Sequence, residues 1–366
     1  MGEGAPRAPV HFPGLNEIRG ITALAIVVSH VNASMGLFGL ESRAYGMVGM
    51  AGFRVWVFFA LSGFLNTYFL LAEKERSGSV DLRRFHVRRA LRIWPVYFLA
   101  IGVAVLLAVV GVEPIPEPVP ITLASYGLMV PNLAYALGLK WWPVAQLWAV
   151  GVLEQFSWFW PGVVKRSGNV LRAALVVVVV YLVVKALAWR SGSSEAYQLV
   201  RMAGFDAMAL GAIGAVLVRR QSPALRLVFS KPVQVAAWAF VAWGILVGPL
   251  HLASVVDAEI HALVVTVLIL NVACNPRAIV TIRSRVLDRL GRVSYELYGF
   301  HMIVVFLVAR GGGGLFGKLG GGGLAHLAVQ AACLVASVLV AAAARRLLAG
   351  PIGRIRARLE RVPLPT

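Results

Sequence analysis

Long apolar runs, separated by short polar or basic stretches, occupy most of the chain. Ten of these runs are long enough to cross a bilayer as helices, which takes about 20 residues, and they lie near 15–38, 47–72, 94–112, 143–164, 170–189, 199–218, 232–249, 254–272, 293–309 and 324–344. Inside a bilayer, a helix satisfies all of its own backbone hydrogen bonds. The pattern therefore predicts an all-α polytopic membrane protein with about ten transmembrane helices.

Two other parts of the chain are not counted as membrane spans. Residues 121–138 are apolar, but counting them as a span would place every later loop on the opposite side of the membrane. Because non-helical backbone persists at membrane depth only where protein or water covers it, we interpret 121–138 as a re-entrant or outer-surface segment. The glycine runs 311–314 and 320–323 predict a flexible outer loop.

Composition supports the membrane assignment, and charge orients it. The 366 residues are 59% hydrophobic and 14% charged, which excludes an ordinary soluble domain. A net charge of +19 would suit a nucleic-acid-binding protein, but with an inner N-terminus 27 Lys and Arg fall in inner segments and 6 in outer ones. This positive-inside bias predicts a plasma- or inner-membrane protein with both termini in the cytoplasm and no nucleic-acid partner.

The chain 1–366 is predicted to be a single membrane domain. Its tail, 345–366, is basic and amphipathic, and we expect it to contact lipid of the inner leaflet. Cys274 and Cys333 fall in or beside separate hydrophobic segments, so the sequence gives no sign of a disulfide, and no metal site is predicted.

Arg19 and His30 place polar groups on the first hydrophobic helix. Eleven residues separate them, which returns to within about 20° of the same helix face after a rise of about 16 Å. Arg19 would therefore lie at one membrane surface and His30 deep in the bilayer. An ionisable side chain at that depth indicates a functional site, although a histidine bonded to a neighbouring helix for packing is an equal alternative.

Basic residues precede the third span. Arg88, Arg89 and Arg92 share one helical face. Arginine gives bidentate hydrogen bonds to phosphate, so these residues are candidates for binding a phosphorylated donor, whereas anchoring at the inner leaflet explains them equally well. The spacing alone does not choose between the two.

Three further segments place reactive residue types in spans. Ser62, next to Gly63, is a candidate nucleophile, but close helix packing is the favoured explanation for this pair. Glu154 at mid-membrane needs a partner, and it could orient a histidine as a general base or form a structural pair. His301 follows Ser294 and Tyr298 on one helix face. Asp206 is another intramembrane acid, with Arg201 as its candidate partner.

Together these segments resemble the integral membrane acyltransferase family 3. The resemblance covers nearly the whole chain, in the order of the family's motifs, and rests on Arg19, His30, 58–64, Arg88, Arg89, Arg92, Pro95, Tyr97, Trp148, Gln155, Phe156, 204–211, Ser294, Tyr295, Tyr298 and His301. Each motif is weak by itself, whereas the combination is specific.

The resemblance implies transfer of an acyl group from acyl-CoA to a hydroxyl of a carbohydrate, a lipid-linked sugar or a small molecule. It implies His30 as the general base or acyl-accepting residue, Arg19 as a residue that positions the donor, and His301 as part of the same cavity; with Glu154 these form the predicted catalytic set. It also implies that the arginines 88, 89 and 92 contact donor phosphate. Ser62, Trp148 and Tyr298 would line the substrate site, and no metal cofactor is expected.

One departure separates this chain from the family pattern. The family's glutamate usually stands where this chain has Leu153, and Glu154 fills the next position, about 100° around the helix. The alternative function is therefore a carrier or flippase, or a catalytically impaired partner in polysaccharide export, because intramembrane charges also serve transport pathways.

Overall fold

The computed structural model describes residues 12–42, 51–248, 255–317 and 322–361, and these residues form helices without a strand. The first half contains α1 (Leu15–Ala33), η1 (Met35–Phe38), α3 (Ala51–Ser77), α4 (Leu82–Val109), α5 (Val119–Gly127), α6 (Pro131–Ala136), η2 (Trp142–Leu147) and α7 (Trp148–Arg166). The second half contains α8 (Val170–Arg190), α9 (Ser194–Ala203), α10 (Phe205–Arg219), α11 (Ala224–Val228), α12 (Lys231–Leu246), α13 (Asp257–Cys274), α14 (Arg285–Arg292), α15 (Ser294–Gly317) and α16 (Gly323–Arg361).

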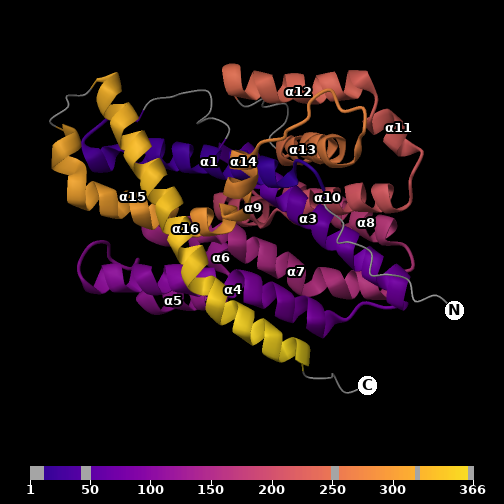
Figure 1. The fold of residues 1–366 in the computed structure, drawn as a ribbon, viewed down its shortest axis with the longest axis horizontal. Coiled ribbons are helices and arrows are strands. Elements are labelled where there is room, and N and C mark those ends of the chain that lie inside the picture. Colours follow the sequence, from indigo (N-terminus) through magenta and orange to yellow (C-terminus); the bar gives the residue numbers. More distant parts are fainter. Residues whose placement is uncertain (1–11, 43–50, 249–254, 318–321, 362–366) are drawn as a thin grey trace.

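The long helices pack side by side in one bundle. In Figure 1, α16 crosses the bundle obliquely, α4 and α5 lie along its lower edge, and α11, α12 and α13 lie together at the upper right. Contacts join α1 to α3, α14 and α15, and they join α3 to α7 and α10. The four helices α1, α3, α7 and α15 carry most of the predicted site residues.

Glycines set a close contact between α3 and α10. A Cβ atom added to Gly63 of α3 would lie 1.9 Å from the carbonyl oxygen of Met208 on α10. A Cβ atom on Gly211 of α10 would lie 2.1 Å from the carbonyl oxygen of Ala60. Only a residue without a side chain permits such an approach, as small residues do between membrane helices. The packing role predicted for Ser62-Gly63 is confirmed for the glycine.

The outer surface of the bundle is apolar. On α8, large side chains face outward in a helical row, with exposed fractions of 52% for Val176, 58% for Val179, 52% for Val183 and 62% for Leu187. In a lipid environment this exposure is the expected state, because lipid tails are as apolar as these side chains. The protein is therefore a multi-pass membrane protein whose helices turn apolar faces outward.

Six helical stretches of the described residues are long and apolar enough to span a membrane, and the bent pair α14–α15, with a 72° angle, makes a seventh. The six are Val55–Ser77, Leu82–Val109, Val170–Arg190, Ser194–Arg219, Asp257–Cys274 and Gly323–Ile355. The 19-residue helices α1 and α7 are not among them, and both carry polar and charged residues. The count of ten spans stays a prediction.

Two predicted segments have a different local structure. Residues 121–138 form the short helices α5 and α6 with a turn between them, so no single helix spans this stretch. The glycine run 311–314, predicted as a loop, is helical and belongs to α15. Inside a bilayer, unpaired backbone costs more than the weak helix propensity of glycine. Part of the second run, 320–321, lies outside the described residues.

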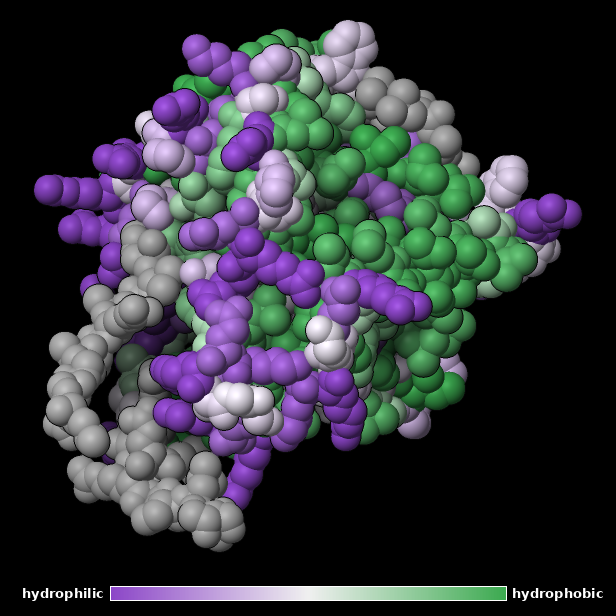
Figure 2. Space-filling model, turned by 90° about the vertical axis from the view of Figure 1, so that its right-hand side faces the viewer, coloured by the Kyte–Doolittle hydropathy of each residue, from purple (hydrophilic) through white to green (hydrophobic). Residues whose placement is uncertain are grey.

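Figure 2 views the end of the molecule that lies on the right in Figure 1, where α3 ends and α11 lies. Hydrophilic side chains gather on part of this face, beside a broad hydrophobic area. The sequence assigns this end to the cytoplasm, because basic residues cluster at the end of α3, in the first turns of α4 and around α11. The cytoplasmic placement of both termini also stays a prediction.

Candidate active site

Two cavities lie among α1, α3, α7 and α15, toward opposite ends of these helices. We call the first, of about 340 Å³, the arginine cavity, and its polar lining consists of Asn16, Arg19, Ser62, Asn66, Arg89, Arg92, Ser294, Tyr295 and Tyr298. The second, of about 500 Å³, is the histidine cavity, and its polar lining consists of Ser29, His30, Trp56, Tyr135, Lys140, Trp148, Gln198, Arg201 and Tyr298. The two cavities share Val55 and Tyr298.

Arg19 and Arg92 come together in the arginine cavity from α1 and α4. They lie close enough for their positive charges to repel each other. Neither forms an ion pair within the part of the chain that the structure describes, because Glu154 pairs with Arg89, and Glu296 pairs with Arg345 at 3.6 Å. Two adjacent guanidinium groups that line a cavity form a site suited to an anion.

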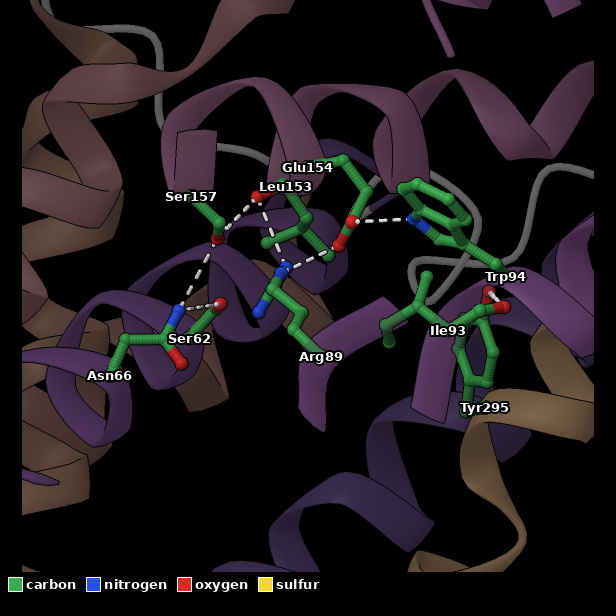
Figure 3. Close-up of polar contacts among 9 residues, drawn as sticks. All are labelled: Ser62, Asn66, Arg89, Ile93, Trp94, Leu153, Glu154, Ser157 and Tyr295. Carbon is green, nitrogen blue, oxygen red and sulfur yellow. Dashed lines mark hydrogen bonds and ion pairs between the residues drawn. The ribbon is translucent and has the colours of Figure 1, made fainter. Parts of the chain in front are cut away.

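Arg89 is held in place by a carboxylate (Figure 3). Its Nε donates to Oε1 of Glu154 at 2.6 Å, and its Nη2 donates to the carbonyl oxygen of Leu153 at 3.1 Å. Trp94 Nε1 donates to the other carboxylate oxygen of Glu154 at 3.2 Å. Glu154 is 2% exposed. The carboxylate therefore forms a structural pair, and the hypothesis that it orients a histidine has no support in this geometry.

Leu153 and Glu154 point to different places because adjacent helix residues are about 100° apart. Leu153 lines the arginine cavity, whereas Glu154 turns toward α4. The position of the family's glutamate thus faces the cavity in this chain and carries an apolar side chain. Arg88, the third member of the predicted basic group, lies away from both cavities and is 3.6 Å from Glu73 at the surface.

Ser62 lies in the wall of the arginine cavity. Its hydroxyl accepts a hydrogen bond from Asn66 Nδ2 at 3.3 Å, and the same amide group lies 3.5 Å from Ser157 Oγ (Figure 3). Ser157 donates to the carbonyl oxygen of Leu153 at 2.8 Å. No base among these partners would activate the hydroxyl, so the structure gives Ser62 the surroundings of a cavity-lining residue.

The two predicted imidazoles meet beside the histidine cavity. His30 Nδ1 lies 2.7 Å from His301 Nε2, and the two rings are nearly parallel, at 11°, and meet edge to edge with their centroids 5.0 Å apart. His301 is fully buried, whereas His30 is partly accessible and lines the histidine cavity. Residues 271 positions apart in sequence are thus in direct contact.

The hydrogen bonds assign the protons of this pair. His301 Nδ1 lies 2.8 Å from the carbonyl oxygen of Tyr298, so this nitrogen carries a proton and donates. In a neutral ring, Nε2 of His301 is then the acceptor, and His30 Nδ1 donates to it. This leaves Nε2 of His30 as the basic nitrogen of the pair. The proton positions follow from the heavy-atom contacts.

Helix spacing and buried hydrogen bonds position α15 at this site. Ser294, Tyr298 and His301 follow one face because they are four and three residues apart. Tyr298 Oη donates to the carbonyl oxygen of Gln146 at 2.7 Å, and Gln146 Nε2 donates to the carbonyl oxygen of Gly299 at 2.9 Å. This reciprocal pair fixes η2 against α15. Trp148, the first residue of α7, faces the histidine cavity.

Asp206 has a different partner from the one predicted. Lys185 of α8 donates to Asp206 at 2.7 Å and to Glu259 of α13 at 2.6 Å, and both Lys185 and Asp206 are 1% exposed. Arg201 instead donates to Gln198 at 2.9 Å. Lys185 lies inside a hydrophobic run, and a charge within a span was the signal that could have revealed this cluster.

The family comparison covers most of the chain. A family model described as an acyltransferase domain, acyltransferase family 3, matches residues 12–346. The match includes α1, both cavities and the histidine pair. No solved structure matches the chain.

Several bacterial proteins are similar in sequence. Peptidoglycan O-acetyltransferase OatA of Listeria monocytogenes is 27% identical over 160 residues, which are 41% of this chain and 24% of that protein. A "putative O-acetyltransferase" of Staphylococcus aureus (strain COL) is 26% identical over 161 residues, again 41% of this chain and 24% of the relative. A "putative peptidoglycan O-acetyltransferase", YrhL of Bacillus subtilis, is 22% identical over 333 residues, 81% of this chain and 49% of the relative. The chain spans about a quarter to a half of these relatives.

Proposed function

This chain belongs to acyltransferase family 3, and we propose that it moves an acetyl or other short acyl group from acyl-CoA to a hydroxyl of a carbohydrate or lipid-linked acceptor. It is an acyltransferase for groups other than aminoacyl groups. The observation that carries the proposal is the His30–His301 pair beside the histidine cavity, which shares Tyr298 with the cavity lined by Arg19 and Arg92. Peptidoglycan, named in two of the relatives, is the first acceptor to test.

The arginine cavity is the proposed donor site. Coenzyme A carries phosphate groups, and Arg19 and Arg92 offer guanidinium donors without a carboxylate partner in the described structure. Arg89 lines the same cavity, but Glu154 and Leu153 fix its position. It would therefore shape the site and offer the N–H groups that these two contacts do not use. Arg88 at the surface would act only at the entrance. The thioester would lie toward Tyr298, where the cavities meet.

The proposed reaction uses the basic nitrogen of the pair. Nε2 of His30 takes the proton of the acceptor hydroxyl, and the oxygen of that hydroxyl attacks the carbonyl carbon of the thioester. The carbon–sulfur bond then breaks, coenzyme A leaves as a thiolate, and this thiolate takes the proton from His30. Histidine acid–base catalysis of this kind contributes about 10²- to 10⁴-fold. His301 would stabilise the imidazolium of His30 through the shared hydrogen bond.

The test is a transfer assay with radiolabelled acetyl-CoA on the purified protein. We expect His30→Ala to lower acyl transfer by about 10²- to 10⁴-fold, because it removes the base. His86→Ala is the matched control, since His86 lies on α4 outside both cavities. Full transfer by the His30→Ala variant would overturn the proposal.

A carrier is the alternative, because two cavities lie toward opposite ends of the same helices. The same assay in detergent separates the two functions, since detergent removes the compartments. Label that appears on an added acceptor supports a transferase. Bound acetyl-CoA with no covalent product supports a carrier.

A further inference from the structure

The histidine cavity has a marked charge pattern. Lys140, between α6 and η2, and Arg201 of α9 both line it, and both side chains are exposed. The helices α6 and α9 are in contact, which brings the two segments together. Among the residues that the structure describes, no Asp or Glu lines this cavity. Its wall is therefore cationic, although the positive-inside bias leaves few basic residues at this predicted outer side.

Neither of these cations is neutralised by a carboxylate in the residues that the structure describes. Lys140 Nζ lies 4.8 Å from the centroid of the Tyr135 ring. Arg201 Nη2 donates to the uncharged amide oxygen of Gln198 at 2.9 Å. Both contacts hold a positive charge in place without cancelling it, because an aromatic face and an amide carry no net charge. A ligand with an acidic group would meet two pre-positioned cations.

Aromatic side chains line the rest of the cavity. Trp56 of α3, Tyr135 of α6 and Trp148 of α7 contribute rings, and Ser29 contributes a hydroxyl next to His30. Aromatic faces pack against the C–H face of a sugar ring, while the Tyr hydroxyl and Trp N–H remain able to hydrogen-bond. A lipid chain would not need two cations and a serine. The lining suits a polar ring compound with a negative charge.

We propose that the histidine cavity binds the acceptor as a saccharide that bears a carboxylate or phosphate. Lys140 and Arg201 bind its acidic group, Trp56 and Trp148 hold its ring, and one hydroxyl points toward His30. The proposal rests on the proposed function for the role of His30, but the binding of the acidic saccharide can be measured without turnover.

The test compares three probes on the purified full-length chain in lipid nanodiscs. They are cellotriose, cellotriose oxidised to the uronic acid at C6 of one glucose unit, and cellotriose phosphorylated at the same C6, so the probes differ only in the group at that carbon. We expect the acidic probes to bind on the order of tenfold more tightly at low salt, and the difference to shrink as salt rises. Lys140→Gln and Arg201→Gln should each weaken binding of the acidic probe about two- to fivefold, as expected for exposed charge pairs.

Arg190→Gln is the matched control, because Arg190 is an exposed arginine at the end of α8 that does not line the cavity. The affinity for neutral cellotriose should stay unchanged in all three variants, which separates a charge effect from misfolding.

Preference for only one acid identifies the acceptor class as a uronate or as a sugar phosphate. Equal binding of neutral and acidic probes, no binding of any probe, or acidic binding unaffected by both variants would overturn the proposal. The proposed function is checked separately by the release of CoA that depends on His30. If the binding proposal fails, this release should still be seen. If no such release is seen, the proposed function fails and the binding proposal does not.

Discussion

At the scale of single residues, the proposed chemistry depends on the contact between His30 and His301. One imidazole is buried and bonded to a backbone carbonyl, and the other reaches a cavity. The buried ring thereby sets which nitrogen of its partner is basic. Such a pair needs only hydrogen bonds and one accessible edge. It needs no carboxylate beside it, and the carboxylate of Glu154 in this chain pairs with Arg89.

His301→Phe should lower kcat by at least about tenfold with little change in the KM for acyl-CoA, because the ring orients His30 and does not bind the donor. His301→Gln should retain more activity, since an amide oxygen can still accept the proton of His30 Nδ1. Steady-state kinetics with labelled acetyl-CoA measures both variants. If Phe and Gln reduce kcat equally, His301 has a packing role and no part in orienting His30.

At the scale of helices, a buried ion pair joins α4 to α7. Arg89→Leu should destabilise the protein by about 3–5 kcal/mol, because it leaves the carboxylate of Glu154 buried without its cation. The double variant Arg89→Leu with Glu154→Leu should be more stable than the single one. Thermal unfolding in detergent measures this effect. Arg88→Gln is the control, since its exposed pair with Glu73 is expected to contribute at most about 1 kcal/mol.

The contact between α3 and α10 depends on two glycines. Gly63→Ala should destabilise the protein by about 1–3 kcal/mol or more, because the added Cβ atom meets the backbone oxygen of Met208, which cannot move away alone. Gly102→Ala on α4 is the control, since its Cβ atom would meet nothing within 4 Å. The unfolding temperature should fall for the first variant only, and equal effects would show that the contact is less tight than described.

At the scale of the whole molecule, the proposed function requires that each of the two cavities be accessible from its own side of the membrane. With the orientation predicted from charge, the arginine cavity would face the cytoplasm and the histidine cavity would face the outside. The proposed donor and the proposed acceptor would then enter their cavities from opposite sides of the membrane. The orientation thus decides the route of the acyl group.

Cysteine labelling tests this orientation. In a chain with Cys274 and Cys333 replaced by Ala, Leu137→Cys should react with an impermeant maleimide in intact cells, because residue 137 is predicted to lie outside and its side chain is 56% exposed. Arg226→Cys in α11 should react only after lysis. The reverse pattern would contradict the predicted orientation and exchange the faces assigned to donor and acceptor.

The sequence determined the helical class, the candidate chemistry and the family, because apolar run length and motif order are local properties of the chain. It identified both histidines and the three arginines that line the arginine cavity, Arg19, Arg89 and Arg92, whereas Arg88 of the same predicted group lies at the surface. It could not assign partners. Glu154 forms an ion pair with Arg89, and Asp206 forms one with Lys185 in place of the predicted Arg201. The sequence does not show such pairs because they join residues of separate helices. The tertiary structure alone decided these contacts, the division into two cavities and the meeting of the imidazoles, since long-range packing fixes which helix faces oppose each other.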